Sequence, residues 1–502
     1  MVKSHLGKRL TRIVAWLVIM KFCAVGSTLA DDADRIQPYS GNPTYWQYSG
    51  QPVVLLGGSD QDNLFNHPNI GPEGLEAHLD LLVSVGGNYV RNTMSSRDRA
   101  DDSSDVYNDD NLYPFHRDPE SGLYDLDRFD VTYWARFRNF LEMTAQRDII
   151  VQIEVFDRFD YAADRAPHYP GLGWSAQPFN PRNNINYSAE QSRLPERVDT
   201  HPGRRENPFF RTTPQQEDNP IVLRYQKSFV DKMLSISLTY PNVLYCVSNE
   251  TNESEHWSAY WARFIRDRAT RAGVSVHVTE MWDAHDLTSP MHRHTFDHPD
   301  LYSFVDTSQN NHQHGQTHWD NMQAARKLVA DPPRPMNNVK IYGGQRHGGG
   351  TVEGTNKLWR NILGGVAAAR FHRPGVRPGY YGIGLNEQAQ THIRSLRMLT
   401  DAMNVFVCEP HNELLSDRQP NEAYCLAEPG RQYAVFFPDG GAVTLDVSAA
   451  KNKLQVRWLD INRSKWQGPR SADGGGTLEL QTPGEGSWAV LVLAEGAANG
   501  GR

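Results

Sequence analysis

The stretch Val243-Leu244-Tyr245-Cys246-Val247-Ser248-Asn249-Glu250 decides the fold of this chain. It is a short run rich in β-branched and aromatic residues, and it ends in an amide and a carboxylate. This pattern indicates a buried parallel strand. In β/α barrels the chemistry takes place at the carboxyl ends of the strands. We therefore expect Glu250 to be a catalytic acid and Asn249 to position the substrate. The alternative for Glu250 is a first-turn glutamate that interacts with the dipole of the following helix.

Strand-like and helical patterns alternate from about residue 50 to residue 400, which is typical of a parallel sheet covered by helices. No Gly-rich phosphate-binding fingerprint follows any of the strands, which argues against a doubly wound open sheet. The sequence predicts a (β/α)8 TIM barrel, an α/β fold. The expected strands are 52–56, 88–94, 149–156, 243–250, 274–279, 301–305, 339–342 and 366–371.

The ends of the chain differ in composition from its middle. Residues 1–30 have a basic start, a short apolar run and a small-residue cleavage site, so we expect a signal peptide and a secreted or periplasmic protein. The barrel is expected over 31–403, with a long lid-like loop at 157–219. Short alternating strands predict a small antiparallel β-sandwich at 404–494, followed by a flexible tail at 495–502.

Charge and cysteine usage narrow the class of protein. Removing residues 1–30 takes away five positive charges and no acid, so the net charge falls from −8 to −13. Such a protein is a poor candidate for binding nucleic acid or an anionic membrane. Export favours a disulfide between Cys408 and Cys425, whereas Cys246 is expected to be a buried free thiol. The sequence leaves the oligomeric state open.

Hydrolysis of a glycosidic bond needs two carboxyl groups. Glu250 suits the acid, because partial burial at a strand end raises the pKa of a carboxyl group. Two residues are candidates for its partner: Glu280 at the end of the fifth strand, and Glu353 in the loop after the seventh. The alternatives are a structural salt bridge to a neighbouring arginine for Glu280 and a helix N-terminal charge for Glu353.

The run Ser248-Asn249-Glu250 resembles the Asn-Glu motif of the retaining glycosidases with cellulase-like barrels, clan A. The whole layout is similar to the apiosidase-like branch, whose C-terminal sandwich is described in that family as a collagen-binding domain. The resemblance implies an acid/base role for Glu250 and a contact from Asn249 to the sugar 2-hydroxyl. It also implies a nucleophilic glutamate at the end of strand seven, where this chain has Gln345.

Further side chains are expected to line the pocket. Trp174 and Trp282 are candidate platforms for stacking on sugars, or else core residues. Arg91 is expected either to bind a sulfate or carboxylate on a sugar or to orient Glu250. His312 and His314 lack a convincing third ligand, so we expect no metal site and no cofactor. The other candidates for the lining are Asp60, Gln345 and His347.

Together these features predict a secreted glycoside hydrolase that acts on a plant or algal carbohydrate. The first alternative is a carbohydrate-binding protein derived from such an enzyme, because Gln345 stands where a nucleophile is expected. The second is a polysaccharide lyase with a Tyr or His base. Since the second carboxylate is not fixed by the sequence, neither retention nor inversion is assigned.

Overall fold

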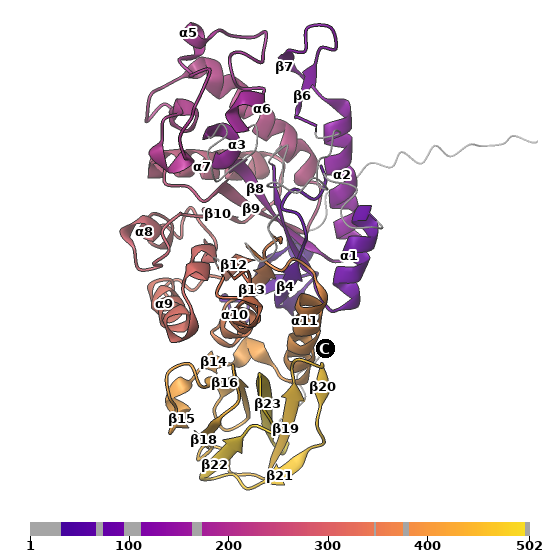
Figure 1. Ribbon diagram of the computed structural model, residues 1–502, viewed down its shortest axis with the longest axis vertical. Coiled ribbons are helices and arrows are strands. Elements are labelled where there is room, and N and C mark those ends of the chain that lie inside the picture. The colour runs from indigo at the N-terminus through magenta and orange to yellow at the C-terminus, as the bar shows by residue number, and fades with distance from the viewer. Residues whose placement is uncertain are drawn as a thin grey trace, which may run out of the picture.

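The computed structural model describes residues 32–66, 74–94, 112–162, 173–345, 348–374 and 381–496 (Figure 1). The predicted signal peptide, most of the predicted tail and His347 lie outside the described residues. Among the helices of the described part, none is long and apolar enough to cross a membrane.

The centre of the molecule is an eight-stranded parallel sheet with the order β10-β9-β8-β5-β4-β13-β12-β11. Neighbours along the chain are neighbours in space, so the sheet curls into a nearly closed barrel. Between the edge strands β10 and β11, the backbone N–H of Val278 donates to Ser303 Oγ at 3.3 Å. The predicted (β/α)8 fold is confirmed. The strands are β4 (Leu55–Gly58), β5 (Tyr89–Thr93), β8 (Ile150–Asp157), β9 (Val243–Asn249), β10 (Val278–Thr279), β11 (Val305–Asp306), β12 (Met336–Ile341) and β13 (Ala368–Phe371).

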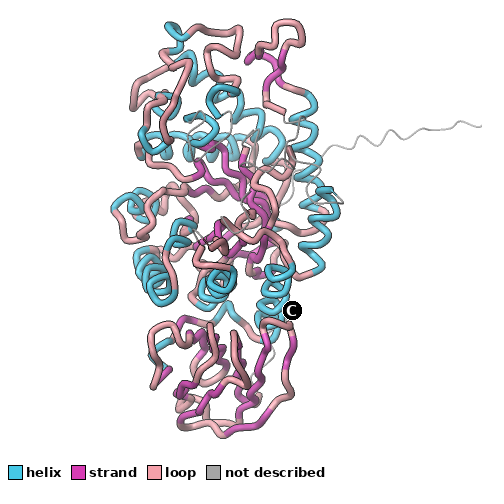
Figure 2. The backbone as a smooth tube through the Cα atoms, in the orientation of Figure 1, coloured by secondary structure: helices cyan, strands magenta, loops and turns pink. Residues whose placement is uncertain are grey.

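Helices surround this sheet (Figure 2). Several of them begin at side-chain caps. Asp130 accepts a hydrogen bond from Tyr133 N, and Asn219 accepts one from Val222 N. The helices around the barrel are α1 (Gly74–Ser84), α2 (Val131–Ala145), α6 (Pro220–Ser237), α7 (Glu255–Arg271), α8 (Pro290–Phe296), α9 (Gly315–Leu328), α10 (Thr351–Leu363) and α11 (Glu387–Ala402).

Polar side chains tie the strands together inside the barrel. Tyr89 Oη donates to Gln152 Oε1 at 2.6 Å, and Asn337 Nδ2 donates to Tyr89 Oη at 3.1 Å. Trp46, from a small sheet of β1 (Gln37–Pro38), β2 (Trp46–Tyr48) and β3 (Gln51–Val53), donates its indole N–H to Asn337 Oδ1 at 2.9 Å. These buried groups pair with one another, so they link neighbouring and facing strands inside the barrel.

The long loop after β8 is a packed unit. It contains the short helices α3 (Arg158–Ala162), α4 (Gly173–Ala176) and α5 (Ala189–Ser192). Phe209 lies at the centre of an aromatic cluster, with the ring of Tyr161 stacked on it at 4.3 Å. The hairpin of β6 (Phe115–Arg117) and β7 (Tyr124–Phe129) joins the cluster through Phe115. Because its aromatic side chains are buried, this segment extends the core above the barrel.

The C-terminal part consists of two antiparallel sheets, as predicted for a sandwich (Figure 1). One has the order β14-β16-β17-β23-β19-β20, with β21 paired to β19, and the other β15-β18-β22. The strands are β14 (Glu409–Pro410), β15 (Leu415–Ser416), β16 (Tyr424–Glu428), β17 (Gln432–Phe437), β18 (Ala442–Asp446), β19 (Leu454–Asp460), β20 (Lys465–Trp466), β21 (Arg470–Ala472), β22 (Thr477–Gln481) and β23 (Trp488–Ala494).

The expected disulfide is not formed. Cys408 and Cys425 are both free and buried, and the thiol of Cys408 donates to the backbone oxygen of Asn404 at 3.2 Å. Burial lets each thiol pack as a small apolar group, so the sandwich needs no covalent link here. Cys246 is a buried free thiol, as predicted.

The hydrophobic core of the barrel extends onto one face of the sandwich, which also has a second core of its own. Trp359 of α10 is fully buried, stacks on Phe436 of β17 at 5.4 Å, and donates its indole N–H to His392 Nδ1 at 3.1 Å. Ser395 of α11 donates to the backbone oxygen of Ile461 at 2.7 Å. The sandwich is therefore fastened to the barrel by both packing and hydrogen bonds.

We predict that Trp359→Ala destabilises the protein by about 3–5 kcal/mol, because it empties the junction between barrel and sandwich. Chemical denaturation followed by tryptophan fluorescence and circular dichroism measures the loss. Val352→Ala on the same helix, where the side chain is 64% exposed, is the matched control. Equal stability of the two variants would contradict a packed junction between barrel and sandwich.

Candidate active site

A cluster of charged side chains lies at the carboxyl ends of β8, β9, β10 and β12. Three of these strands are adjacent in the sheet, and β12 faces them across the barrel. Arg158 follows β8, Glu250 follows β9 and Asp283 follows β10, while Lys340 is the penultimate residue of β12. Each side chain therefore has its place fixed by a different strand of one rigid sheet.

Glu250 has the backbone geometry of a residue held in place by its surroundings. Its φ is +53°, in the left-handed region that a residue with a Cβ seldom adopts. The next residue, Thr251, holds the turn, because its N–H donates to Met281 O at 2.8 Å and its carbonyl accepts from Asp283 N at 2.9 Å. Such strain persists where the fold over-determines a residue, and it is concentrated at functional sites.

The carboxylate of Glu250 is held between two cations. Lys340 Nζ donates to its Oε1, and Arg158 Nη2 lies 3.7 Å from its Oε2. Lys340 Nζ also donates to Asn249 Oδ1 at 2.6 Å, and the amide of Asn249 donates to Asp157 Oδ1 at 3.0 Å. Asn249 thus orients the lysine that holds Glu250.

These contacts set the charge of Glu250. Burial alone would raise its pKa, but the ammonium of Lys340 and the guanidinium of Arg158 together lower the pKa far below the ordinary value. Glu250 is therefore an anion across the physiological range. A general acid must carry a proton at neutral pH. The negative charge of Glu250 therefore does not fit the acid role that we expected from the sequence.

Asp283 is the second carboxyl group of the cluster. Its Oδ2 lies 2.8 Å from Arg158 Nη2, the same nitrogen that faces Glu250. Burial raises the pKa of Asp283, the charge of Arg158 opposes this, and the negative charge of Glu250 raises it further. Its side chain remains 29% exposed, and that of Glu250 13% exposed, so both can meet a ligand that enters the barrel mouth.

Arg91 belongs to a neighbouring network that is sealed from solvent. Its guanidinium lies 2.6 Å from Glu154 and 3.2 Å from Asp62, and its side chain is only 1% exposed. Burial raises the pKa of Glu154 to about 7 against the effect of Arg91. Arg370 and Arg373 also lie within ion-pair distance of Asp62. Arg91 therefore pairs with the carboxylates of Asp62 and Glu154. The cations that contact Glu250 are Lys340 and Arg158, so the structure does not place Arg91 in the expected role of orienting Glu250.

Glu280 lies away from Glu250, between the sheet and α7. Its Oε1 accepts hydrogen bonds from the backbone N–H groups of Ser248 at 2.8 Å and of Met281 at 2.9 Å. Its side chain is buried, and burial raises its pKa to about 8. The geometry makes Glu280 a clamp between β9 and β10. It differs from the predicted alternative, a salt bridge, because the two donors are backbone amides.

Glu353 and His314 lie together at the start of α9 and α10, apart from the cluster. Glu353 is in the first turn of α10, pairs with Arg360 and accepts a hydrogen bond from Gly315 N at 3.1 Å. His314 Nδ1 is 3.8 Å from Glu353. This is the helix N-terminal placement that the sequence offered as the alternative for Glu353.

Strand seven supplies a lysine where a nucleophile was expected. Gln345 lies beyond β12 in an exposed turn, so it does not occupy the strand end. The inward-reaching charge from β12 is that of Lys340, which is only 2% exposed. The seventh strand therefore places a cation opposite Glu250.

The two expected tryptophan platforms are covered. Trp174 has no exposed surface and donates its indole N–H to Pro195 O at 2.7 Å. Trp282 is 1% exposed and donates to Thr295 Oγ1 at 2.7 Å. Stacking on a sugar needs an open ring face, so this placement does not fit the expected role, and both residues are part of the core.

Two other expected lining residues have different surroundings. His312 stacks on His285 with ring centroids 3.6 Å apart and meets the ring of Tyr342 edge-on at 5.6 Å. Burial lowers the pKa of His312 to about 3, with His285 adding to the effect. Asp60 accepts a hydrogen bond from Leu385 N at 2.8 Å and lies 3.9 Å from His78. His312 is thus a neutral ring beside the cluster, and Asp60 ties the end of β4 to the segment just before α11.

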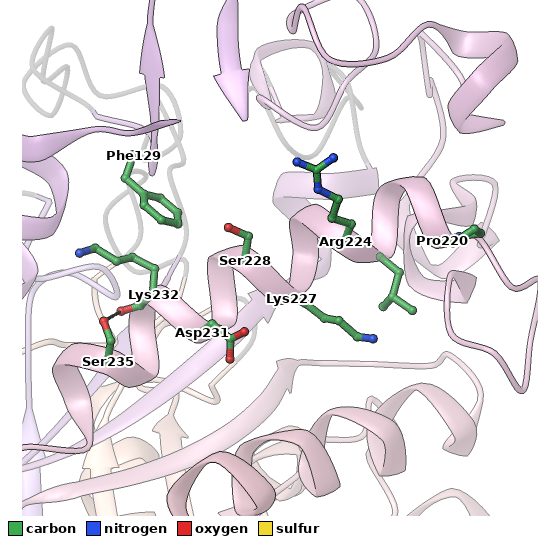
Figure 3. A pocket seen from close by; sticks show the side chains of 9 residues that line it. Phe129, Pro220, Arg224, Lys227, Ser228, Asp231, Lys232 and Ser235 are labelled. Carbon is green, nitrogen blue, oxygen red and sulfur yellow. Dashed lines mark hydrogen bonds between the residues drawn. The ribbon is translucent and has the colours of Figure 1, made fainter. Parts of the chain in front are cut away.

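Other features of the surface do not belong to this cluster. Within the described ranges, no three His, Cys, Asp or Glu side chains are arranged to hold a metal ion. A groove of about 660 Å³ runs along α6 on the outside of the barrel, bordered by Phe129, Arg224 and Lys232 (Figure 3). None of its lining residues comes from the cluster around Glu250.

Three members of the cluster carry only weak signals in the sequence. Lys340 is a charged residue between the apolar residues Val339 and Ile341 near the end of its strand, which is a sign of a buried ion pair. Arg158 and Asp283 stand just past the ends of their strands, at positions where loop residues of any kind are common. Their convergence depends on the closure of the barrel.

Comparison with known proteins gives the fold. No protein-family model matches the chain, and no curated protein matches it. Among solved structures, a glycoside hydrolase family 5 protein from Bacteroides vulgatus ATCC 8482 has a TM-score of 0.61 at 11% identity, covering 94% of this chain and 95% of its own. This coverage includes both the barrel and the sandwich.

Two further solved structures extend the likeness. A glycoside hydrolase family 5 mannosidase from Rhizomucor miehei, in complex with mannosyl-fructose, has a TM-score of 0.50 at 11% identity and covers 73% of this chain and 97% of its own. An α-amylase from H. orenii has a TM-score of 0.50 at 11% identity, covering 88% and 98%. At such identities the likeness shows the fold alone.

We predict that Glu280→Gln keeps the fold and changes its pH dependence. Because burial raises the pKa of Glu280 from 4.5 to about 8, the folded protein holds this proton more tightly than the unfolded chain. The wild type should therefore lose stability relative to the variant as pH rises from about 4.5 to about 8, by a few kcal/mol. Urea unfolding at several pH values measures the difference.

Glu255→Gln, on the exposed start of α7, is the control for removing one carboxylate nearby. A stability difference between wild type and Glu280→Gln that stays constant with pH would contradict a buried, neutral Glu280.

Proposed function

We propose that this protein is a glycoside hydrolase whose catalytic carboxyl groups are Glu250 and Asp283. The observation that carries the proposal is their common contact with Arg158 Nη2, at 3.7 and 2.8 Å, together with opposite shifts of their pKa values. Two carboxyl groups whose surroundings drive their pKa values apart are the pattern of an acid and a base.

The shifts assign the roles. Glu250, held ionised, is the base or the nucleophile. Asp283, whose pKa is raised, keeps its proton more readily and is the acid that protonates the leaving oxygen. This is the reverse of the role that the sequence suggested for Glu250. Arg158 holds the two groups near each other, and the strained backbone of Glu250 fixes the direction of its side chain.

Other features support a carbohydrate as the substrate. The similar solved structures carry the names of glycoside hydrolases, and the site lies at the carboxyl ends of the barrel strands, where the chemistry of this fold takes place. The basic and apolar start of the chain supports export, which suits an enzyme that degrades a plant or algal polysaccharide. We also propose that neither nucleic acid nor a membrane is a partner, given the acidic balance of the chain.

A second candidate function is carbohydrate binding without hydrolysis. It is favoured by the ion pair between Lys340 and Glu250. Lys340 belongs to the seventh barrel strand, the strand on which the resemblance implies a nucleophile. A carboxylate locked in a buried ion pair is a weak base. The two functions differ in whether the wild-type protein releases a product.

We predict that Glu250→Gln and Asp283→Asn each lower kcat/KM by about 10²–10⁴-fold, because each removes one side of the proton transfer. Activity is measured as release of 4-nitrophenol from a panel of 4-nitrophenyl glycosides and as new reducing ends from plant and algal polysaccharides. Circular dichroism verifies that the variants are folded.

The exposed Asp286→Asn, three residues beyond Asp283, is the matched control and should keep wild-type activity. Retention of full activity in Glu250→Gln would end the proposal. Saturable binding of oligosaccharides by the wild type without any product would favour the second candidate.

A further inference from the structure

We propose that the substrate is an anionic sugar, and that Lys340 binds its carboxylate or sulfate group in exchange for Glu250. This inference rests on the proposed function, because it concerns the same site. It adds the class of substrate and a specificity-determining residue that the two catalytic carboxyl groups do not themselves define.

The first step concerns the burial of Lys340. Its side chain is 3% exposed, and its ammonium contacts Glu250 Oε1 and Asn249 Oδ1 deep in the barrel mouth. A buried ammonium is costly unless an anion neutralises it, and removing one partner of such a pair leaves an uncompensated charge. In the free protein Glu250 is that anion, while Asn249 supplies only a neutral oxygen.

The second step concerns catalysis. As base or nucleophile, Glu250 must direct an oxygen to a water molecule or to the sugar, but Oε1 accepts from Lys340 and Oε2 faces Arg158. An oxygen that accepts from a cation is a poor base, so we infer that the carboxylate moves away from Lys340 when the substrate binds. That movement leaves the ammonium of Lys340 with a single neutral partner. A neutral sugar cannot replace the lost charge, whereas a uronate or a sulfate ester can.

The third step concerns the neighbouring donors. Arg158 is buried, and its Nε and Nη1 have no hydrogen-bond partner among the described residues. Lys340 and Arg158 face the carboxyl groups of Glu250 and Asp283. The site therefore has two spare guanidinium donors for one further oxyanion.

The adjacent network has the same bias. Arg91, Arg370 and Arg373 lie within ion-pair distance of Asp62, and Arg91 also pairs with Glu154. This network therefore holds three guanidinium groups and two carboxyl groups. An anionic ring bound at Lys340 would lie beside a network in which cations outnumber carboxyl groups.

The test measures binding, so it does not depend on turnover. The probes are the methyl glycosides of glucuronic, galacturonic and mannuronic acid, each compared with its neutral counterpart, and glucose 6-sulfate compared with glucose. Isothermal titration at constant ionic strength gives the dissociation constants. In the wild type we expect at least one acidic probe to bind about tenfold or more tightly than its neutral counterpart.

The decisive variant is Glu250→Gln. Because the sugar anion competes with Glu250 for Lys340, removing the charge of Glu250 should strengthen binding of the acidic probe about tenfold and leave the neutral probe unchanged. Lys340→Met should abolish the preference for the acidic probe. The double variant Lys340→Met with Glu250→Gln removes both charges together, so it tests the preference even if the single Lys340 variant fails to fold.

Lys327→Met, on the exposed side of α9, is the control for loss of one lysine and should keep the preference. Equal binding of every acidic and neutral pair by the wild type, or unchanged binding of the acidic probe in Glu250→Gln, would overturn the inference. A preference for sulfate over uronate would retain it and identify the anion. Absence of hydrolysis with the preference intact would instead count against the proposed function alone.

Discussion

The ion pair between Lys340 and Glu250 is the interaction on which the rest of the site depends. It joins strands β9 and β12 across the barrel, so it forms only when the sheet has curled into a closed shape. It fixes the charge of Glu250. Burial raises the pKa of Asp283, and the negative charge of Glu250 raises it further, while Arg158 opposes both effects. The surroundings of the two carboxyl groups thus shift their pKa values in opposite directions.

The barrel provides the rigidity that this arrangement needs. Glu280 clamps β9 to β10 through the backbone of Ser248 and Met281, directly below the turn in which Glu250 is strained. The loop that begins at Arg158 contains the aromatic cluster around Phe209. Phe209 packs on Phe156 of β8, so the cluster holds this loop against the barrel. A side chain held at positive φ keeps its direction only when the backbone on both sides is fixed in this way.

Much of the fold could be predicted from the sequence, because local patterns specify it. The apolar run before Asn249 and the alternation of strands and helices predicted the barrel, and the short alternating strands after residue 404 predicted the sandwich. The prediction was wrong for the disulfide. Cys408 and Cys425 pack as buried thiols, although their proximity in the sequence and the expected export suggested a bridge.

The sequence by itself determined that Glu250 stands at the carboxyl end of a buried strand. Strand burial and the turn that follows depend on residues that are neighbours along the chain. Only the tertiary structure decided which charges surround it. Arg158, Asp283 and Lys340 are separated by many residues along the chain, and their contacts depend on the order in which strands close the barrel. Electrostatic energies vary with distances in space, so the protonation of Glu250 follows from the closed barrel and cannot be read from the residues beside it.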